Sequence, residues 1–236
     1  MRDDIAEVYG SGGERVNAQL LPLESRPETI SDRVLVSIRE AIITRTLAPG
    51  SIVTEAQLAK DLGVSKTPVR EALLRLREVG LVHSMPVRGM MIIESTRDTM
   101  VKAYELRGLL EAGAAKFAAQ RATEEQIAAM EVAAAESLRL ANEHDADGFR
   151  RSDRTFHSTL WSASGNAELE RIADNAYSLS SALRAIHALS GRDSINCAQQ
   201  HVDITRTIKE RDGQRAADLA SAHVHDVLQY SLESPP

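Results

Sequence analysis

The alternation of apolar and polar residues near position 60 predicts two helices separated by a short break. Apolar side chains recur with helical spacing over 58–62 and again over 69–76. Gly63 lies between them and can adopt the left-handed backbone that ends a helix, while Ser65 or Thr67 can cap the next one. Two amphipathic helices joined by a short glycine-containing turn predict a helix-turn-helix, whose second helix enters the DNA major groove.

Sequences on both sides of this motif complete a winged helix. Before it, apolar residues four positions apart predict a first helix with Ser31 as its N-cap; these residues are Ile30, Val34, Ile38 and Ile42. After it, the short apolar runs 81–85 and 90–93 flank a tight turn at 86–89 and predict the two strands of a wing. A plain hairpin that covers the core is the alternative for this last segment.

From Thr96 onwards the pattern is helical almost to the end of the chain, which predicts a mainly α protein. Thr123 and Gln126 have the spacing of a capping box. Six consecutive helices with short connections predict an all-α antiparallel bundle. These helices are predicted over 97–122, 123–142, 147–163, 168–188, 193–212 and 214–232.

Composition and charge narrow the functional classes. Aromatic residues make up only 3%, which argues against a platform that stacks single-stranded bases. The net charge of −6 is distributed unevenly, because residues 31–93 hold nine Lys and Arg against six Asp and Glu. The predicted DNA-binding segment is therefore the basic one. With Cys197 as the only cysteine, an intrachain disulfide is excluded and a reducing cytoplasm is expected.

The second helix of the helix-turn-helix and the wing carry side chains suited to DNA contact. Arg75 lies on that helix, and Arg88 and Gly89 lie at the tip of the wing, where Arg88 can enter a minor groove. The alternative is a helical hairpin with a solvated basic face. The residues at the start of the helix, where base edges and phosphates are reached, are Ser65, Lys66, Thr67 and Arg70.

Four polar residues in the helical segment are potential metal ligands. Asp153 and His157 are four apart on one predicted helix and project from the same face. His201 and His223 lie on two later helices that an antiparallel bundle can bring alongside. Three imidazoles and one carboxylate suit a divalent ion, Zn, Ni or Mn, to which an anionic ligand can also bind. The alternative is that these histidines are surface or hydrogen-bonded core residues.

The stretch SKTPVREALLRLREVGLV, residues 65–82, resembles the recognition-helix signature of the GntR family of bacterial transcription regulators. The resemblance extends back over 30–50 and forward into the wing. Lys66 replaces the usual Arg of the family, which keeps a phosphate contact but removes the bidentate fork to guanine. The wing reads Pro-Val-Arg-Gly at 86–89, where the family usually has Gly-basic-Gly.

A GntR winged helix followed by about six helices is similar to the FadR subfamily. Its C-terminal ligand-binding (FCD) domain commonly carries an Asp, a His four residues later and two further His. The segments SDRTFHSTLW, QQHVDITRTI and LASAHVHDVL match this pattern. The resemblance therefore implies metal ligands at Asp153, His157, His201 and His223. His225 is a competitor expected to point to another face, and the histidines expected to be structural or exposed are His83, His144 and His187.

The segment from Tyr104 to Glu111 resembles the opening helix of that same domain, in which the Arg points into the effector cavity. The resemblance implies that Arg107 pairs with an effector carboxylate in a bidentate fork. An intrahelical salt bridge between Arg107 and Glu111 is the alternative. Arg184 is a further candidate for effector binding.

These observations predict a cytoplasmic, homodimeric transcription regulator that binds double-stranded operator DNA, a repressor relieved by a small carboxylate. Such an effector changes DNA affinity only if it binds differently to the DNA-competent and the DNA-incompetent arrangement of the protein. We expect this coupling between the bundle and the winged helix to pass through residues 93–100. The expected organisation is a flexible tail at 1–28, a winged helix-turn-helix at 29–94, an FCD effector-binding and dimerisation domain at 95–232, and a C-terminal tail at 233–236.

Two other functional classes are compatible with parts of this pattern. One is a metal-dependent hydrolase with an accessory DNA-binding domain, since three His and one Asp can activate water. No Glu stands in a motif position suited to a general base, which argues against that class. The other is a constitutive architectural DNA binder whose bundle only dimerises. No secretory signal and no membrane-spanning run is recognised in the sequence.

Overall fold

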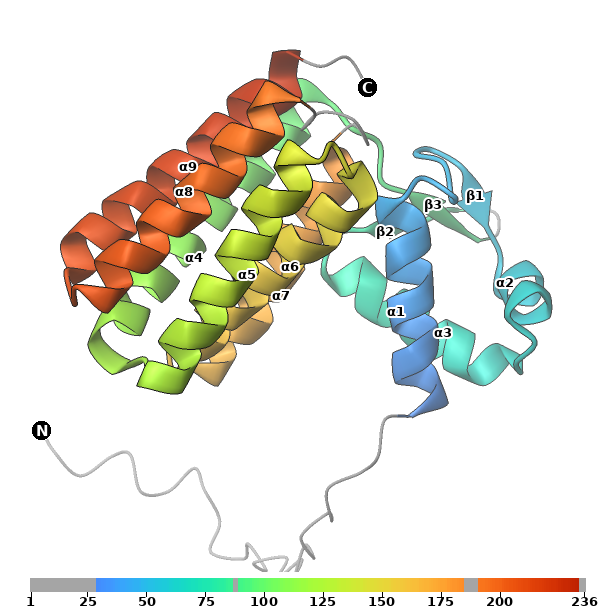
Figure 1. Cartoon of the computed structure of the whole chain (residues 1–236). Helices are drawn as coiled ribbons and strands as arrows, with labels where there is room; N and C mark the ends of the chain where they lie inside the picture. Colours follow the sequence, from blue (N-terminus) through green and yellow to red (C-terminus); the bar gives the residue numbers. More distant parts are fainter. Residues whose placement is uncertain (1–28, 87–88, 185–190, 234–236) are drawn as a thin grey trace, which may run out of the picture.

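A computed structural model describes residues 29–86, 89–184 and 191–233, and places a small winged helix beside a helical bundle (Figure 1). The predicted tail at 1–28, the tip of the wing with Arg88, His187 and the last three residues lie outside the described residues. The mainly α fold predicted from the sequence is confirmed. The winged helix consists of α1 (Ile30–Ile43), β1 (Ile52–Val53), α2 (Glu55–Leu62), α3 (Lys66–Glu78), β2 (Val82–Ser84) and β3 (Met90–Ile92).

The turn between α2 and α3 follows the sequence pattern closely. Gly63 ends α2 in the left-handed conformation, with φ of 66°. Ser65 occupies the N-cap position of α3, although its side chain makes no capping hydrogen bond. At α1 the prediction of Ser31 as the cap is wrong, because the helix begins at Ile30 and its N-cap is Thr29, two residues earlier. Thr29 accepts from the backbone N–H of Asp32, whose carboxylate accepts from the backbone N–H of Thr29 in return.

The predicted pair of strands belongs to a three-stranded antiparallel sheet with the order β1-β3-β2. The two-residue strand β1 was not predicted, because so short a segment has no alternation to detect. Gly89 precedes β3 with φ of 94°, and a Cβ atom there would lie 2.6 Å from the Val53 carbonyl oxygen. The hairpin therefore requires glycine at this position, both for its backbone angle and for its close approach to β1.

The bundle contains α4 (Arg97–Arg121), α5 (Glu124–Asn142), α6 (Ala146–Ala163), α7 (Ala167–Leu183), α8 (Arg192–Lys209) and α9 (Gly213–Glu233). The predicted capping box of Thr123 and Gln126 is confirmed at the start of α5. The largest error is at α7, which ends at Leu183 rather than Ala188, so Arg184 leaves the helix in an extended conformation. No helix of the described residues is long and apolar enough to cross a membrane.

The C-terminal half of α7 connects the bundle to the winged helix. Ala182 and Leu183 are buried in the same apolar cluster as the core of the winged helix. The Asp174 carboxylate accepts from Arg39 Nη1 of α1 at 2.9 Å and from Arg154 Nη2 of α6. The winged helix is thus held to the bundle by apolar packing and by an ion-pair network that includes α6.

Candidate functional site

The four predicted metal ligands lie together inside the bundle, fully buried, on α6, α8 and α9. Asp153 Oδ1 is 3.8 Å from His157 Nε2 and 3.6 Å from His201 Nε2. His223 Nε2 is 3.4 Å from His157 Nε2. We call these four residues the histidine cluster. Their donor atoms are close enough for a single cation to contact several of them.

Outer contacts hold the two imidazoles of α8 and α9 with their Nε2 atoms directed into the cluster. His223 Nδ1 lies 2.9 Å from Gln200 Oε1, and Gln200 is itself oriented because its amide N–H donates to Asp226 at 2.6 Å. His201 Nδ1 lies 3.4 Å from the Ser137 hydroxyl. Metal-binding histidines typically have such a partner on the second ring nitrogen, which fixes the ring and leaves the first nitrogen for the ion.

The pKa shifts in the cluster favour neutral imidazoles at His201 and His223 and an ionised carboxylate at Asp153. Burial lowers the pKa of His201 to about 3 and holds the pKa of His223 well below its ordinary value. Burial alone would raise the pKa of Asp153, but its neighbours, first His157 and His201 and then Arg184 and Arg107, outweigh burial and lower it. Neutral imidazole and ionised carboxylate are the forms that bind a divalent cation, so the residues fit such an ion.

Arg107 lies at the edge of the histidine cluster and makes both of the contacts that the sequence left as alternatives. Its Nε is 3.4 Å from Glu111 Oε1, which is the predicted intrahelical ion pair. Its Nη2 is also 2.9 Å from His157 Nε2, and its guanidinium lies over the Tyr177 ring, 4.6 Å from the centroid. Arg107 therefore competes with a cation for the same His157 nitrogen.

Several members of this site were missed by the sequence reasoning. Glu111 was considered only as a partner of Arg107, yet its Oε1 is 3.0 Å from His157 Nδ1 and its Oε2 accepts from Trp161 Nε1 at 2.9 Å. The Tyr177 hydroxyl donates to Asp153 Oδ2 at 2.6 Å. Helical spacing of four connects Glu111 to Arg107 and Trp161 to His157, and this signal was available in the sequence.

Arg184 lines a second feature, a pocket of about 280 Å³ where α1 meets α6 and α7. Its position outside α7 places it near the histidine cluster, where its charge helps to keep Asp153 ionised. Tyr177 is shared by this pocket and the cluster. We call this pocket of about 280 Å³ the arginine pocket. Its described lining residues include Arg150, Arg151, Arg154 and Arg184, and a single acidic residue, Glu40.

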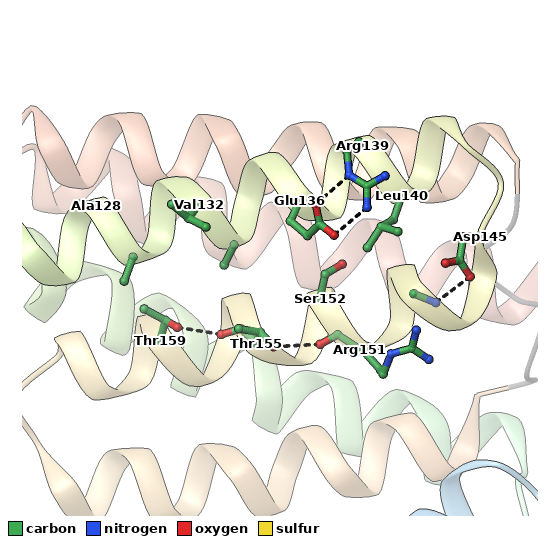
Figure 2. A pocket seen from close by; sticks show the side chains of 13 residues that line it. Ala128, Val132, Glu136, Arg139, Leu140, Asp145, Arg151, Ser152, Thr155 and Thr159 are labelled. Atoms are coloured by element: carbon green, nitrogen blue, oxygen red, sulfur yellow. Dashed lines mark hydrogen bonds and ion pairs between the residues drawn. The ribbon is translucent and has the colours of Figure 1, made fainter.

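A wider groove of about 820 Å³ lies on the outside of the bundle between α5 and α6 (Figure 2). Figure 2 shows Glu136 paired with Arg139 on one wall and Thr155 and Thr159 on the other. None of its lining residues belongs to the histidine cluster. Val132 on its α5 wall is 70% exposed, which makes this groove a partly apolar outer face.

Most of the predicted DNA-binding residues that the structure describes lie at the start of α3 or in the turn of the wing. Arg70 is 63% exposed and forms a bidentate ion pair with Glu55, at 2.9 and 2.8 Å. Lys66, Arg70 and Gly89 line one depression of about 320 Å³, so the start of α3 lies next to the turn between β2 and β3 of the wing. Ser65 and Thr67 are exposed beside them. Arg75 is half exposed and paired with Asp32 at 2.7 Å.

The remaining histidines of the described residues lie away from the cluster. His225 is exposed and lies 3.4 Å from the side-chain amide of Gln229, on a different face of α9 from His223, as predicted. His83 and His144 are exposed. The three described histidines that the sequence analysis did not select as ligands are therefore all exposed.

Comparison with known proteins matches two family models to successive parts of the chain. Residues 30–92 match the family described as "Bacterial regulatory proteins, gntR family", and residues 102–226 match the family described as "FCD domain". The "Nta operon transcriptional regulator" of Aminobacter aminovorans is 31% identical over 78% of this chain and 86% of its own length. The "Galactonate operon transcriptional repressor" of Escherichia coli K12 is 25% identical over 80% of this chain and 91% of its own. Among solved structures, E. coli McbR/YncC matches with a TM-score of 0.77 at 18% identity, covering 87% and 98% of the two chains, which supports the fold.

Proposed function

Since the chain belongs to the gntR family of bacterial regulatory proteins and carries an FCD domain, it is a DNA-binding transcription regulator, and we propose that it is a repressor relieved by a small carboxylate. The observation that carries the proposal is the histidine cluster, a buried group of side chains able to bind a cation, which lies next to two arginines in the same chain as a winged helix. The relatives of this chain are transcription regulators and not enzymes, so the alternative of a metal-dependent hydrolase is set aside.

We propose that the exposed start of α3 and the turn of the wing form the DNA-binding surface. Its support is the clustering of Lys66, Arg70 and Gly89 around one depression, with Ser65 and Thr67 exposed alongside. The proposed contacts also include Arg75 on α3 and Arg88 at the wing tip. Phosphate contacts would hold the protein in register, while side chains at the start of the helix read base edges.

Replacing Arg70 by Ala is expected to weaken operator binding roughly 5- to 150-fold if Arg70 reads a base. Operator duplexes selected from random DNA would be used at fixed salt, with binding followed by fluorescence anisotropy. Arg171→Ala is the matched control, because Arg171 is also 63% exposed and also forms an ion pair, with Glu168 at 2.9 Å, but on α7 of the bundle. Equal operator affinities for wild type and Arg70→Ala would refute the role of Arg70.

For the bundle, we propose that a divalent ion, Zn, Ni or Mn, binds to Asp153, His157, His201 and His223. Support comes from the donor atoms within 3.4–3.8 Å of one another along the cluster and from the oriented Nδ1 partners of His201 and His223. When bound, such an ion supplies a positive centre to which an anionic ligand can attach directly. The residues of this chain keep that ion in a dry interior and orient its ligands.

Arg107 and Arg184 are the proposed partners of the effector carboxylate. Arg107 is buried beside His157, and Arg184 faces the arginine pocket, which has an excess of positive side chains. A carboxylate placed between the ion and Arg107 would accept from the guanidinium in a fork and draw it away from His157 Nε2. Helix α6 carries Asp153, His157 and Arg154, so a shift of α6 reaches α1 through Asp174 and Arg39.

The experiment that tests this function is release of operator DNA by small carboxylates. Metal-loaded protein bound to its operator would be challenged with a panel of mono-, di- and hydroxycarboxylates, with anisotropy as the readout. We expect at least one acid to weaken DNA binding in the wild type and to lose its effect in Arg107→Met. A protein that binds DNA with unchanged affinity under every acid would instead be the constitutive architectural binder considered above.

We further propose that the protein is a cytoplasmic homodimer with the domain limits expected from the sequence, 29–94 and 95–232. Exposed apolar side chains on the outside of the bundle support dimerisation: Leu106 and Leu109 of α4 are 46% and 76% exposed, and Val132 of α5 is 70% exposed. A dimer would cover such side chains and place two winged helices on the half-sites of a palindromic operator.

A further inference from the structure

Cys197 lies beside the histidine cluster, one helical turn before His201 on α8. The two residues are four apart, so both project from the same face of the helix. The Cys197 side chain is fully buried. Its Sγ is 3.8 Å from Asp153 Oδ1 and 3.9 Å from His201 Nε2. The sulfur therefore faces two donor atoms of the cluster.

The three donor atoms form a nearly equilateral triangle. The third side, between Asp153 Oδ1 and His201 Nε2, is 3.6 Å. In a tetrahedral zinc site, metal–sulfur bonds of about 2.3 Å and metal–nitrogen or metal–oxygen bonds of about 2.0–2.1 Å place donors roughly 3.3–3.6 Å apart. The observed separations exceed these values by a few tenths of an ångström, so small side-chain movements suffice to close the triangle on one ion.

A fourth ligand can come from His157, which lies outside this close triangle but next to one of its corners. His157 Nε2 is 3.8 Å from Asp153 Oδ1, the carboxylate oxygen that faces Cys197. His223 lies on the far side of His157, 3.4 Å away, and its Nε2 does not share the close triangle with Asp153 and Cys197. The described residues thus offer five donor groups, while a tetrahedral ion takes four.

We propose that Cys197 is a thiolate ligand of the bound ion, which makes this centre selective for thiophilic ions such as zinc over manganese. The inference rests on the proposed function, because it assumes that a divalent ion binds in the histidine cluster. On binding, the S–H bond breaks, the sulfur–metal bond forms and the proton leaves to solvent, so the ion replaces a proton and no oxidant is needed. Thiolate is a soft ligand that suits zinc and cobalt, whereas manganese prefers oxygen donors.

Cobalt(II) provides a direct test, because thiolate-bound cobalt has a sulfur-to-metal charge-transfer band in the near ultraviolet that nitrogen and oxygen ligands do not give. Metal-stripped full-length protein, kept reduced with a phosphine rather than a thiol, would be titrated with cobalt chloride. Since Cys197 is the only cysteine, any such band must come from this residue. We expect the band to saturate together with the visible cobalt bands, at one common stoichiometry.

Cys197→Ser is expected to lose the near-ultraviolet band and to keep the visible bands, with cobalt still bound by the remaining ligands. The preference for zinc over manganese, measured by competition, is expected to fall roughly 10–100-fold. Loss of a hydrogen-bond partner of a metal ligand already lowers metal affinity by this much, so loss of a ligand itself should have at least the same effect. Cys197→Ala serves as a second variant, with circular dichroism to verify that both are folded.

Two results would overturn the proposal, and they differ in what else they affect. Visible cobalt bands without a charge-transfer band in the wild type would show that Cys197 is not a ligand, while leaving the metal centre of the proposed function intact. Absence of any cobalt, zinc or manganese binding by the wild type would remove both the thiolate ligand and that metal centre.

Discussion

Replacing Glu111 by Gln is expected to lower the free energy of unfolding by about 3–5 kcal/mol, the usual loss when one partner of a buried ion pair is removed. The Glu111 side chain is 1% exposed and lies against Arg107 and His157. Burial alone would raise its pKa, but these neighbours and the Trp161 hydrogen bond outweigh burial and lower it. Gln keeps the shape and can still accept from Trp161, so the change isolates the loss of charge. Urea unfolding of metal-stripped protein, followed by circular dichroism, would measure it.

Two control variants make this measurement specific. Glu136→Gln breaks an exposed ion pair with Arg139 on α5 and is expected to change stability little, since solvent screens such pairs. Arg107→Met combined with Glu111→Leu replaces the buried pair by apolar side chains and is expected to recover most of the lost stability. A loss below about 1 kcal/mol in Glu111→Gln would mean that the carboxylate does not stabilise the buried guanidinium.

Replacing His157 and His201 together by Ala is expected to abolish metal binding, from about one ion per chain in the wild type to almost none. The two residues come from different helices, and without them Asp153, Cys197 and His223 do not form a close group of three donor atoms. Protein purified without a histidine tag would be analysed by inductively coupled plasma mass spectrometry. The bound ion should also stabilise the wild type, by about 4 kcal/mol when its free concentration is about 1,000 times the Kd.

His83→Ala combined with His225→Ala is the matched control for this pair. It removes the same number of imidazoles, but both residues are exposed and lie away from the cluster. Metal content and thermal stability in this control should match the wild type. Full metal occupancy in the variant that lacks His157 and His201 would refute the assignment of the metal centre.

The sequence predicts the elements of this fold well where the determining interactions are local. The left-handed Gly63 and the capping box of Thr123 depend on residues within one turn, and both were predicted correctly. Thr29 was missed as the cap of α1 because Ser31 is chemically equivalent and only the position of the first turn distinguishes them. The end of α7 was misplaced because the helical periodicity of the sequence continues past Leu183, while the backbone of Arg184 is already extended.

The candidate site was only partly predictable, because its members meet through tertiary packing. The histidine cluster could be proposed from spacing and from the family resemblance, which together select four residues on three helices. Tyr177 and Cys197 could not be selected in this way, since their contacts with Asp153 join residues 24 and 44 positions apart. Arg70 was correctly expected on the exposed face of α3, but its ion pair with Glu55 depends on the packing of α2.

The shared carboxylate of Asp174 affects how the ionic strength dependence of DNA binding should be interpreted. Its two ion pairs, with Arg39 and Arg154, are only partly buried, with side chains 18–30% exposed. Added salt therefore screens this connection between the winged helix and the bundle at the same time as it weakens contacts with DNA phosphates. For this regulator, the slope of the logarithm of the DNA-binding constant against the logarithm of salt concentration therefore depends both on the phosphate contacts and on the orientation of the winged helix. The same titration with an Asp174→Asn variant would separate the two contributions.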